Sequence, residues 1–199
     1  MHDPVPDRRN RFAYWLGKVF HPYVICVPTL IALLWGEPWV SLVGWVTVMV
    51  AILLPPLLVT GLLLKHRQRH LYQRASRAPM YLVFWGSLLI CLGVLIALNA
   101  PHILITCVVA LMLWLPLQLA INTYVTKVST HAAVVVACVM GLGLLGKLTH
   151  PWLLLAALLA VGLTLWARVA TRNHTLTQVI VGSLTGAISV LIVFPLMLR

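Results

Sequence analysis

Acidic residues are the scarcest feature of this 199-residue chain, which has three of them against 14 lysines and arginines. They are Asp3, Asp7 and Glu37, and none lies in the basic loops described below. A Mg²⁺ or Ca²⁺ site needs several carboxylates, so a divalent-metal mechanism is close to excluded. Catalysis by a pair of carboxylates is excluded for the same reason. We expect no cofactor and no metal.

Charge of either sign is also scarce: 9% of the residues are charged and 62% are hydrophobic. A soluble domain of ordinary composition has about a quarter charged residues. Lipid must therefore cover most of the surface, and no polar stretch is long enough to form a separate soluble domain. We expect a basic N-terminal segment over residues 1–18 and a single transmembrane domain over 19–199.

Cysteines are few and isolated, and no two have the spacing of metal ligands. Each lies inside an apolar segment, where a cysteine behaves as a small hydrophobic residue. Neither disulfides nor a zinc site are expected of them. The four are Cys26, Cys91, Cys107 and Cys138.

What the sequence does have is long apolar runs. A spanning helix needs roughly 20 apolar residues, with about 17 to 25 tolerated. Seven segments meet or approach this length, and the count falls to six if one of the two short ones does not span. The sequence therefore predicts an all-α, polytopic transmembrane bundle of six to seven helices. The segments are residues 19–35, 39–64, 80–98, 103–125, 131–146, 151–167 and 176–198.

The cations are distributed unequally between the two sides of such a bundle. Alternating spans place twelve of the 14 on the side of the N-terminus and leave Lys147 and Arg199 on the other. By the positive-inside rule the basic side is cytoplasmic. We expect an integral protein of a bacterial inner membrane, with its N-terminus in the cytoplasm. The net charge of +11 faces lipid headgroups rather than nucleic acid.

Three loops on the basic side contain more than anchoring residues: 65–79, 127–131 and 168–178. Taken singly, most of their cations and histidines would be ordinary interfacial residues. Together they supply Arg and Lys to neutralise phosphate oxygens, hydroxyls to donate hydrogen bonds, and His to act as nucleophile or proton donor. This is the set that metal-free phosphoryl transfer would need.

The spacing in these loops resembles the type 2 phosphatidic acid phosphatase (PAP2) superfamily, which includes the vanadium haloperoxidases. Its signatures are K-x6-R-P, P-S-G-H and S-R-x5-H-x3-D. Here Arg168-x5-His174-x3-Gln178 matches the third, with Ala167 in place of the serine and Gln178 in place of the aspartate, and 128–131 matches the second with two replacements. The first is degraded: its nearest substitute is His70-x6-Arg77-Ala-Pro79, and Arg67 and Arg69 are equally good phosphate ligands.

The resemblance implies a PAP2/haloperoxidase-like helical core and a role for each matching residue. His174 would be the nucleophile that forms a phosphohistidine, and His131 the general acid that protonates the leaving alkoxide. Gln178, one helical turn after His174, would orient the nucleophile with its amide oxygen. The phosphate-binding residues would be Lys127, Ser129, Thr130, Arg168 and one or more of Arg67, Arg69 and Arg77.

The implied function is a metal-independent lipid phosphate phosphatase, acting on a phosphatidic acid-type lipid or a polyprenyl phosphate or diphosphate at the cytoplasmic face. A non-catalytic protein that binds or flips lipid phosphates is the alternative. The expected partners are the lipid substrate and membrane lipids. The sequence leaves the lipid tail and the oligomeric state open, a homo-oligomer included.

Overall fold

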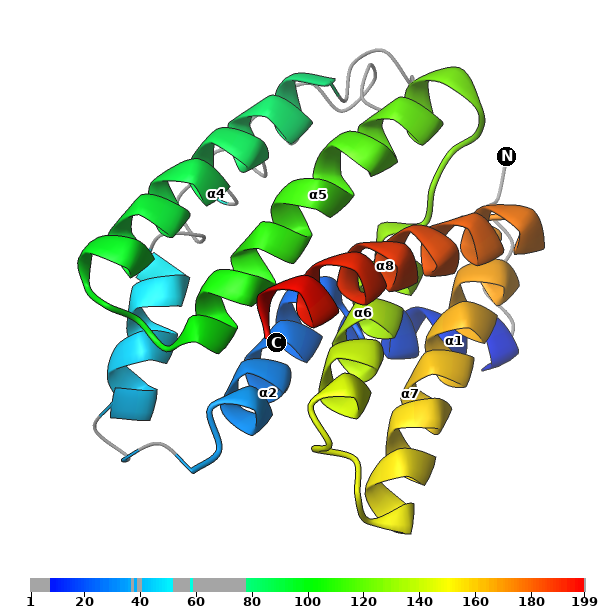
Figure 1. Ribbon diagram of the computed structural model, residues 1–199. Coiled ribbons are helices and arrows are strands. Elements are labelled where there is room, and N and C mark those ends of the chain that lie inside the picture. The colour runs from blue at the N-terminus through cyan, green and yellow to red at the C-terminus, as the bar shows by residue number, and fades with distance from the viewer. Residues whose placement is uncertain (1–7, 37, 39–40, 52–57, 59–77, 199) are drawn as a thin grey trace. The chain divides into compact units, whose positions relative to one another are not determined.

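The computed structural model describes residues 8–36, 38, 41–51, 58 and 78–198. These residues form helices and no β-strand (Figure 1), which confirms the all-α prediction. The labelled helices are α1 (Arg8–Val19), α2 (Pro22–Leu33), α4 (Ala78–Ala97), α5 (His102–Tyr124), α6 (Thr130–Leu144), α7 (Pro151–Ala170) and α8 (Leu176–Met197); residues Ser41–Ala51 form a further helix.

Three helices, α5, α7 and α8, are long and apolar enough to cross a membrane. The count rises to four if the bent pair of α1 and α2 forms one span. This supports a membrane protein, although the described residues give fewer spans than the six to seven counted from the sequence. Much of the predicted second segment lies outside them, and α6 is 15 residues long, below the spanning length.

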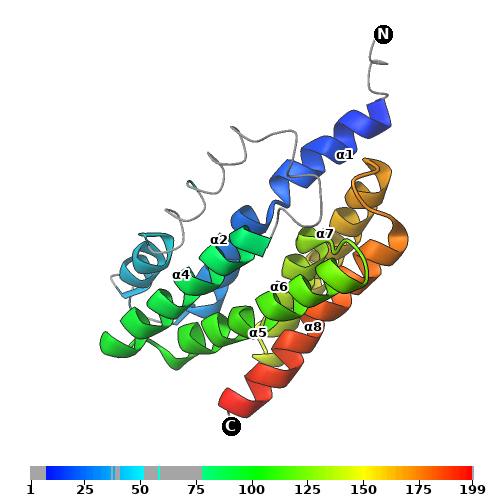
Figure 2. The same cartoon turned by 90° about the horizontal axis from the view of Figure 1, so that it is seen from above.

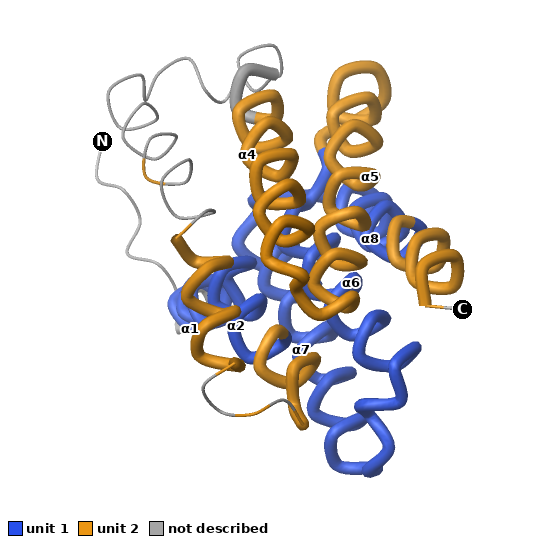
Figure 3. The backbone as a smooth tube through the Cα atoms, turned by 60° about the vertical axis from the view of Figure 1, so that its left-hand side comes forward, with its two compact units in different colours: residues 1–29, 128–188 blue, residues 30–127, 189–199 orange. Residues whose placement is uncertain are grey.

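The chain divides into two compact units (Figure 3). Unit 1 comprises residues 1–29 and 128–188, and unit 2 comprises 30–127 and 189–199. In unit 2 the hairpin of α4 and α5 is joined by two side-chain contacts, Gln118 Nε2 to the Tyr81 hydroxyl at 3.0 Å and Trp85 Nε1 to the Met112 carbonyl at 3.1 Å. The residues predicted for the second and third signatures, apart from Lys127, belong to unit 1.

A proline separates the first two helices of unit 1. Pro22 is the first residue of α2, and α1 and α2 are bent by 43° with respect to each other. Proline disfavours the helical conformation in the residue before it, so α1 ends and His21 is left at the corner. The corner has a functional consequence, because His21 lines the cavity described below.

Helix α1 packs on α7 (Figure 2) through an apolar face. Ala13 and Leu16 are buried against Ala167, with Phe20 and Trp166 beside them. These α1 residues recur at three- and four-residue steps, the spacing of one helical face. Because Ala167 is near the C-terminal end of α7, this packing holds α1 next to that end.

Helix α8 crosses the start of α6 at very short range. A Cβ on Gly182 would lie 2.5 Å from the Ser129 carbonyl oxygen, and one on Gly186 would overlap the Ala133 carbonyl. The small-xxx-small spacing of the two glycines allows this backbone approach. The backbone N–H of Ser129 also donates to the Gln178 carbonyl at 3.3 Å. The second and third signature segments are thereby joined.

Candidate functional site

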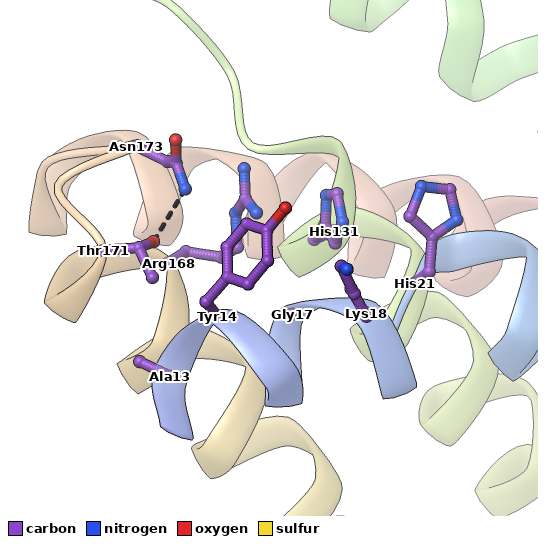
Figure 4. Close-up of a pocket in the computed structure, with 9 residues that line it drawn as sticks. All are labelled: Ala13, Tyr14, Gly17, Lys18, His21, His131, Arg168, Thr171 and Asn173. Carbon is purple, nitrogen blue, oxygen red and sulfur yellow. Dashed lines mark hydrogen bonds between the residues drawn. The ribbon is translucent and has the colours of Figure 1, made fainter. Parts of the chain in front are cut away.

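A cavity of about 200 Å³ lies in unit 1 where α1, α6 and α7 come together (Figure 4). Residues from the α1–α2 segment line it together with residues from the beginning of α6 and the end of α7. The cavity is lined by Ala13, Tyr14, Gly17, Lys18, His21, His131, Arg168, Thr171 and Asn173. It therefore brings His131 and Arg168, which the resemblance assigns to one site, to the same space.

Arg168 is a half-buried cation with an unsatisfied donor. Its Nε is buried and has no hydrogen-bond partner. No carboxylate is present among the described residues, because Asp3, Asp7 and Glu37 all lie outside them. A cation withdrawn from water needs a compensating negative charge. Arg168 is therefore suited to receive an anion from the cavity.

The turn after α7 connects Arg168 to His174. Arg172 has a left-handed backbone conformation with φ 55°, which ends the helix and redirects the chain. The His174 backbone N–H then donates to the Arg168 carbonyl at 3.2 Å, and Asn173 Nδ2 donates to Thr171 Oγ1 at 2.7 Å. The spacing of five residues between Arg168 and His174 is thus one compact, hydrogen-bonded turn.

Gln178 contacts His174 and also caps α8. Its Oε1 lies 3.2 Å from His174 Nδ1 and accepts from the Thr175 backbone N–H at 3.3 Å. The Gln178 N–H donates in return to Thr175 Oγ1 at 3.3 Å. This reciprocal pair is a capping box, in which a Thr and a Gln three residues later satisfy each other's backbone donors. With the His174 proton on Nδ1, the lone pair lies on Nε2.

At the start of α6, Ser129 has a structural role and His131 lines the cavity. Ser129 is fully buried and its side chain accepts from the Ala132 N–H at 3.5 Å, which makes it the N-cap of α6. Two residues further, His131 lines the cavity. The His21 ring meets the His131 ring edge to face, with centroids 5.2 Å apart. The cavity thus contains a histidine pair.

The environment of His131 disfavours its charged form. The residue lies in the first turn of α6, at the loop end of this helix. Burial, followed by the positive charge of Arg168 and the proximity of His21 and His174, lowers the pKa of His131 to about 3. Burial and the charge of Arg168 therefore favour the neutral form of His131.

The remaining predicted residues fall in three groups. His174 and Gln178 lie beside the cavity, next to Asn173, without lining it. Thr130 is the half-buried first residue of α6, and Lys127 belongs to unit 2. Phosphate binding by these two residues stays a prediction from the sequence. Arg67, Arg69 and Arg77 lie outside the described residues.

Sequence reasoning missed the contribution of the first helix. It treated Lys18 as a topological anchor and gave His21 and Tyr14 no role, yet all three line the cavity. One signal was available: Ala13, Leu16 and Phe20 predict an amphipathic helix ending at the His21-Pro22 break. Nothing in the sequence paired that helix with α7.

The described residues contain no group of three or more His, Cys, Asp or Glu side chains placed to hold a metal ion. The arrangement instead combines cationic donors, two cavity histidines and a third histidine oriented by an amide. Such a set can bind a tetrahedral oxyanion and exchange protons with it. No family model, curated protein or solved structure matches this chain.

Proposed function

We propose that this protein is a metal-independent membrane phosphatase that removes phosphate from a lipid phosphate. The observation that carries the proposal is that Arg168, a cation whose buried Nε has no hydrogen-bond partner, lines one cavity together with His21 and His131. A phosphate group supplies both the negative charge and the acceptors that Arg168 lacks. Its arrival also offsets the positive charge of Arg168, which after burial is the next cause of the lowered pKa of His131.

The reaction would proceed in two displacements. His174 Nε2 attacks phosphorus while Gln178 accepts from Nδ1–H, and the bond from phosphorus to the lipid oxygen breaks. His131, protonated once phosphate is bound, donates its proton to that oxygen. Water then attacks the phosphohistidine, with His131 taking the proton, and inorganic phosphate leaves.

A second cavity supports a lipid rather than a soluble substrate. It has a volume of about 250 Å³ and is lined by Phe20 and by side chains of α2, α6 and α7 that are almost all apolar, among them Val135 and Ala160. Phe20 precedes His21, and Val135 is one turn, about 6 Å, beyond His131. An acyl or prenyl chain could extend into it from a phosphate held by Arg168.

The proposal extends to architecture and placement. We place the chain in the PAP2 superfamily, with a haloperoxidase-like core of six to seven spans, in a bacterial inner membrane with this site at the cytoplasmic face. The twelve-to-two distribution of cations and the joined second and third signature segments support it. An impermeant thiol reagent that labels a cysteine at position 175 from outside would overturn the orientation.

Non-catalytic binding or flipping of lipid phosphates is the second candidate. It is favoured by the position of His174 beside the cavity rather than in its wall. Purified protein incubated with phosphatidic acid and with a polyprenyl diphosphate distinguishes the two candidates. We expect phosphate release that persists in EDTA, is inhibited by vanadate, and disappears in His174→Ala.

The matched control is His102→Ala, because His102 is an exposed histidine at the start of α5 whose backbone contact to Thr106 survives the change. Full activity of His174→Ala would overturn the mechanism. Binding of either lipid by the wild type without phosphate release would favour the second candidate.

A further inference from the structure

We infer that Lys18 of α1 is a phosphate-binding residue of this site, acting opposite Arg168. The inference rests on the proposed function. It concerns an element outside all three signature segments, and it gives a direct role to a residue that the charge pattern alone classifies as an anchor.

The first observation is position. Lys18 lines the same cavity as Arg168 and His131, and it lies one turn before the corner that places His21 there. Arg168 Nη1 lies close to Gly17 beside it, since a Cβ at Gly17 would be in ordinary contact with that atom at 3.8 Å. The Arg168 guanidinium therefore reaches the surface of α1, and the two cations border one space.

The second observation is that the Lys18 side chain is held. Its Nζ lies 4.8 Å from the centroid of the Tyr14 ring, four residues earlier on the same helical face. Figure 4 shows the Tyr14 and Lys18 side chains rising from the same side of α1. Tyr14 also lines the cavity. The ring restrains the ammonium at the cavity and leaves its N–H donors for a ligand.

The third observation is electrostatic. Two cations that share a cavity repel each other. An oxyanion bound between them satisfies both, and a phosphate has enough acceptor oxygens to receive Lys18, Arg168 and a histidine together. Lys18 would thus supply the lysine contact for which residues 65–77 offer no clear match.

The experiment measures binding of radiolabelled inorganic phosphate to the purified full-length protein in a neutral detergent, by equilibrium dialysis. We expect Lys18→Gln to weaken binding about tenfold or more, the loss associated with one charge-assisted hydrogen bond. Lys18→Arg should keep most of the affinity.

The matched control is Arg11→Gln. It removes one cation from the same helix, and Arg11 is exposed like Lys18, but it does not line the cavity and lies about 10 Å further along α1. Arg11→Gln should bind phosphate within about twofold of the wild type. Equal weakening by both substitutions would mean that only the general positive field matters, and would overturn the inference.

Tyr14→Leu provides a second, independent test because it leaves the charge in place. Loss of the ring contact should weaken phosphate binding about two- to fivefold, in line with an exposed cation–π contact. Unchanged affinity in both Lys18→Gln and Tyr14→Leu overturns the inference while the proposed function stands. Absence of phosphate binding and of phosphate release in the wild type overturns the proposed function, and this inference with it.

Discussion

His21 and His131 meet edge to face in the cavity, with ring centroids 5.2 Å apart. One ring comes from the corner between α1 and α2 and the other from the first turn of α6. Arg168 and Lys18 line the same cavity, so a proton placed on either ring adds to a positive charge already present. The protonation state of the pair is therefore coupled to whether an anion is bound.

Anion binding should be accompanied by proton uptake. The pKa of His131 is lowered to about 3 by burial and by Arg168, which favours the neutral ring. A bound dianion favours the charged form and raises this pKa, so protons are taken up and affinity increases as pH falls. Sulfate is a suitable probe because it stays a dianion throughout the range from pH 5 to pH 8.

Calorimetry in two buffers of different ionisation enthalpy measures this uptake. We expect a buffer-dependent binding enthalpy in the wild type and a smaller dependence in His131→Asn. His102→Asn serves as the control and should behave as the wild type. Identical enthalpies in both buffers at pH 6 would contradict the coupling.

Arg168→Met should separate stability from binding. The substitution removes a half-buried cation that has no described carboxylate partner and keeps an unbranched side chain of similar length. We expect phosphate binding to be lost and the Tm of the phosphate-free protein in detergent to stay equal or rise. A clear fall in that Tm would show that Arg168 stabilises the fold without a ligand.

Gln178→Glu should raise turnover relative to the wild type. A glutamate can keep the capping box with Thr175, and its carboxylate stabilises a charged His174 ring better than the amide does. Gln178→Ala should lose both the cap, worth about 1 kcal/mol, and the orientation of the ring. The measurements are kcat and Tm for each variant; a lower kcat of Gln178→Glu at every pH would contradict the orienting role.

Alanine at Gly182 or Gly186 should destabilise the protein and abolish activity together. The new methyl group would strike the backbone at Ser129 or Ala133, which cannot move like a flexible side chain. The expected cost is about 1–3 kcal/mol, read as a lower Tm in detergent. Gly162→Ala is the control, because nothing lies within 4 Å of its Cβ position, and it should be neutral or slightly stabilising.

The sequence predicted contacts between residues that are close together in the chain. Gln178 follows His174 by four residues, and the structure places His174 Nδ1 and Gln178 Oε1 3.2 Å apart across the start of α8. The all-α architecture and the apolar helices also followed from composition. These features depend on residues close together in the sequence.

The contribution of α1 could not be predicted in this way. Lys18 and His21 reach the cavity only because Ala13 and Leu16 pack against Ala167, a contact between helices far apart in the chain. Many apolar faces in this sequence could have received α1, and periodicity does not choose among them. Ser129 caps α6 through a local contact to Ala132, but the approach of α8 to its backbone is a long-range contact of the same kind.

Two missing methyl groups set the distance between the His131 and His174 segments. Gly182 and Gly186 carry no polar atom towards phosphate, yet they determine how closely α8 approaches the backbone that leads into His131. A mutational scan of this protein would therefore score these two positions like the histidines themselves. Loss of activity on substitution of Gly182 or Gly186 would reflect the distance between two helices and not a chemical role. Positions found to be sensitive in such a scan should therefore be compared with the backbone contacts before a catalytic role is assigned to them.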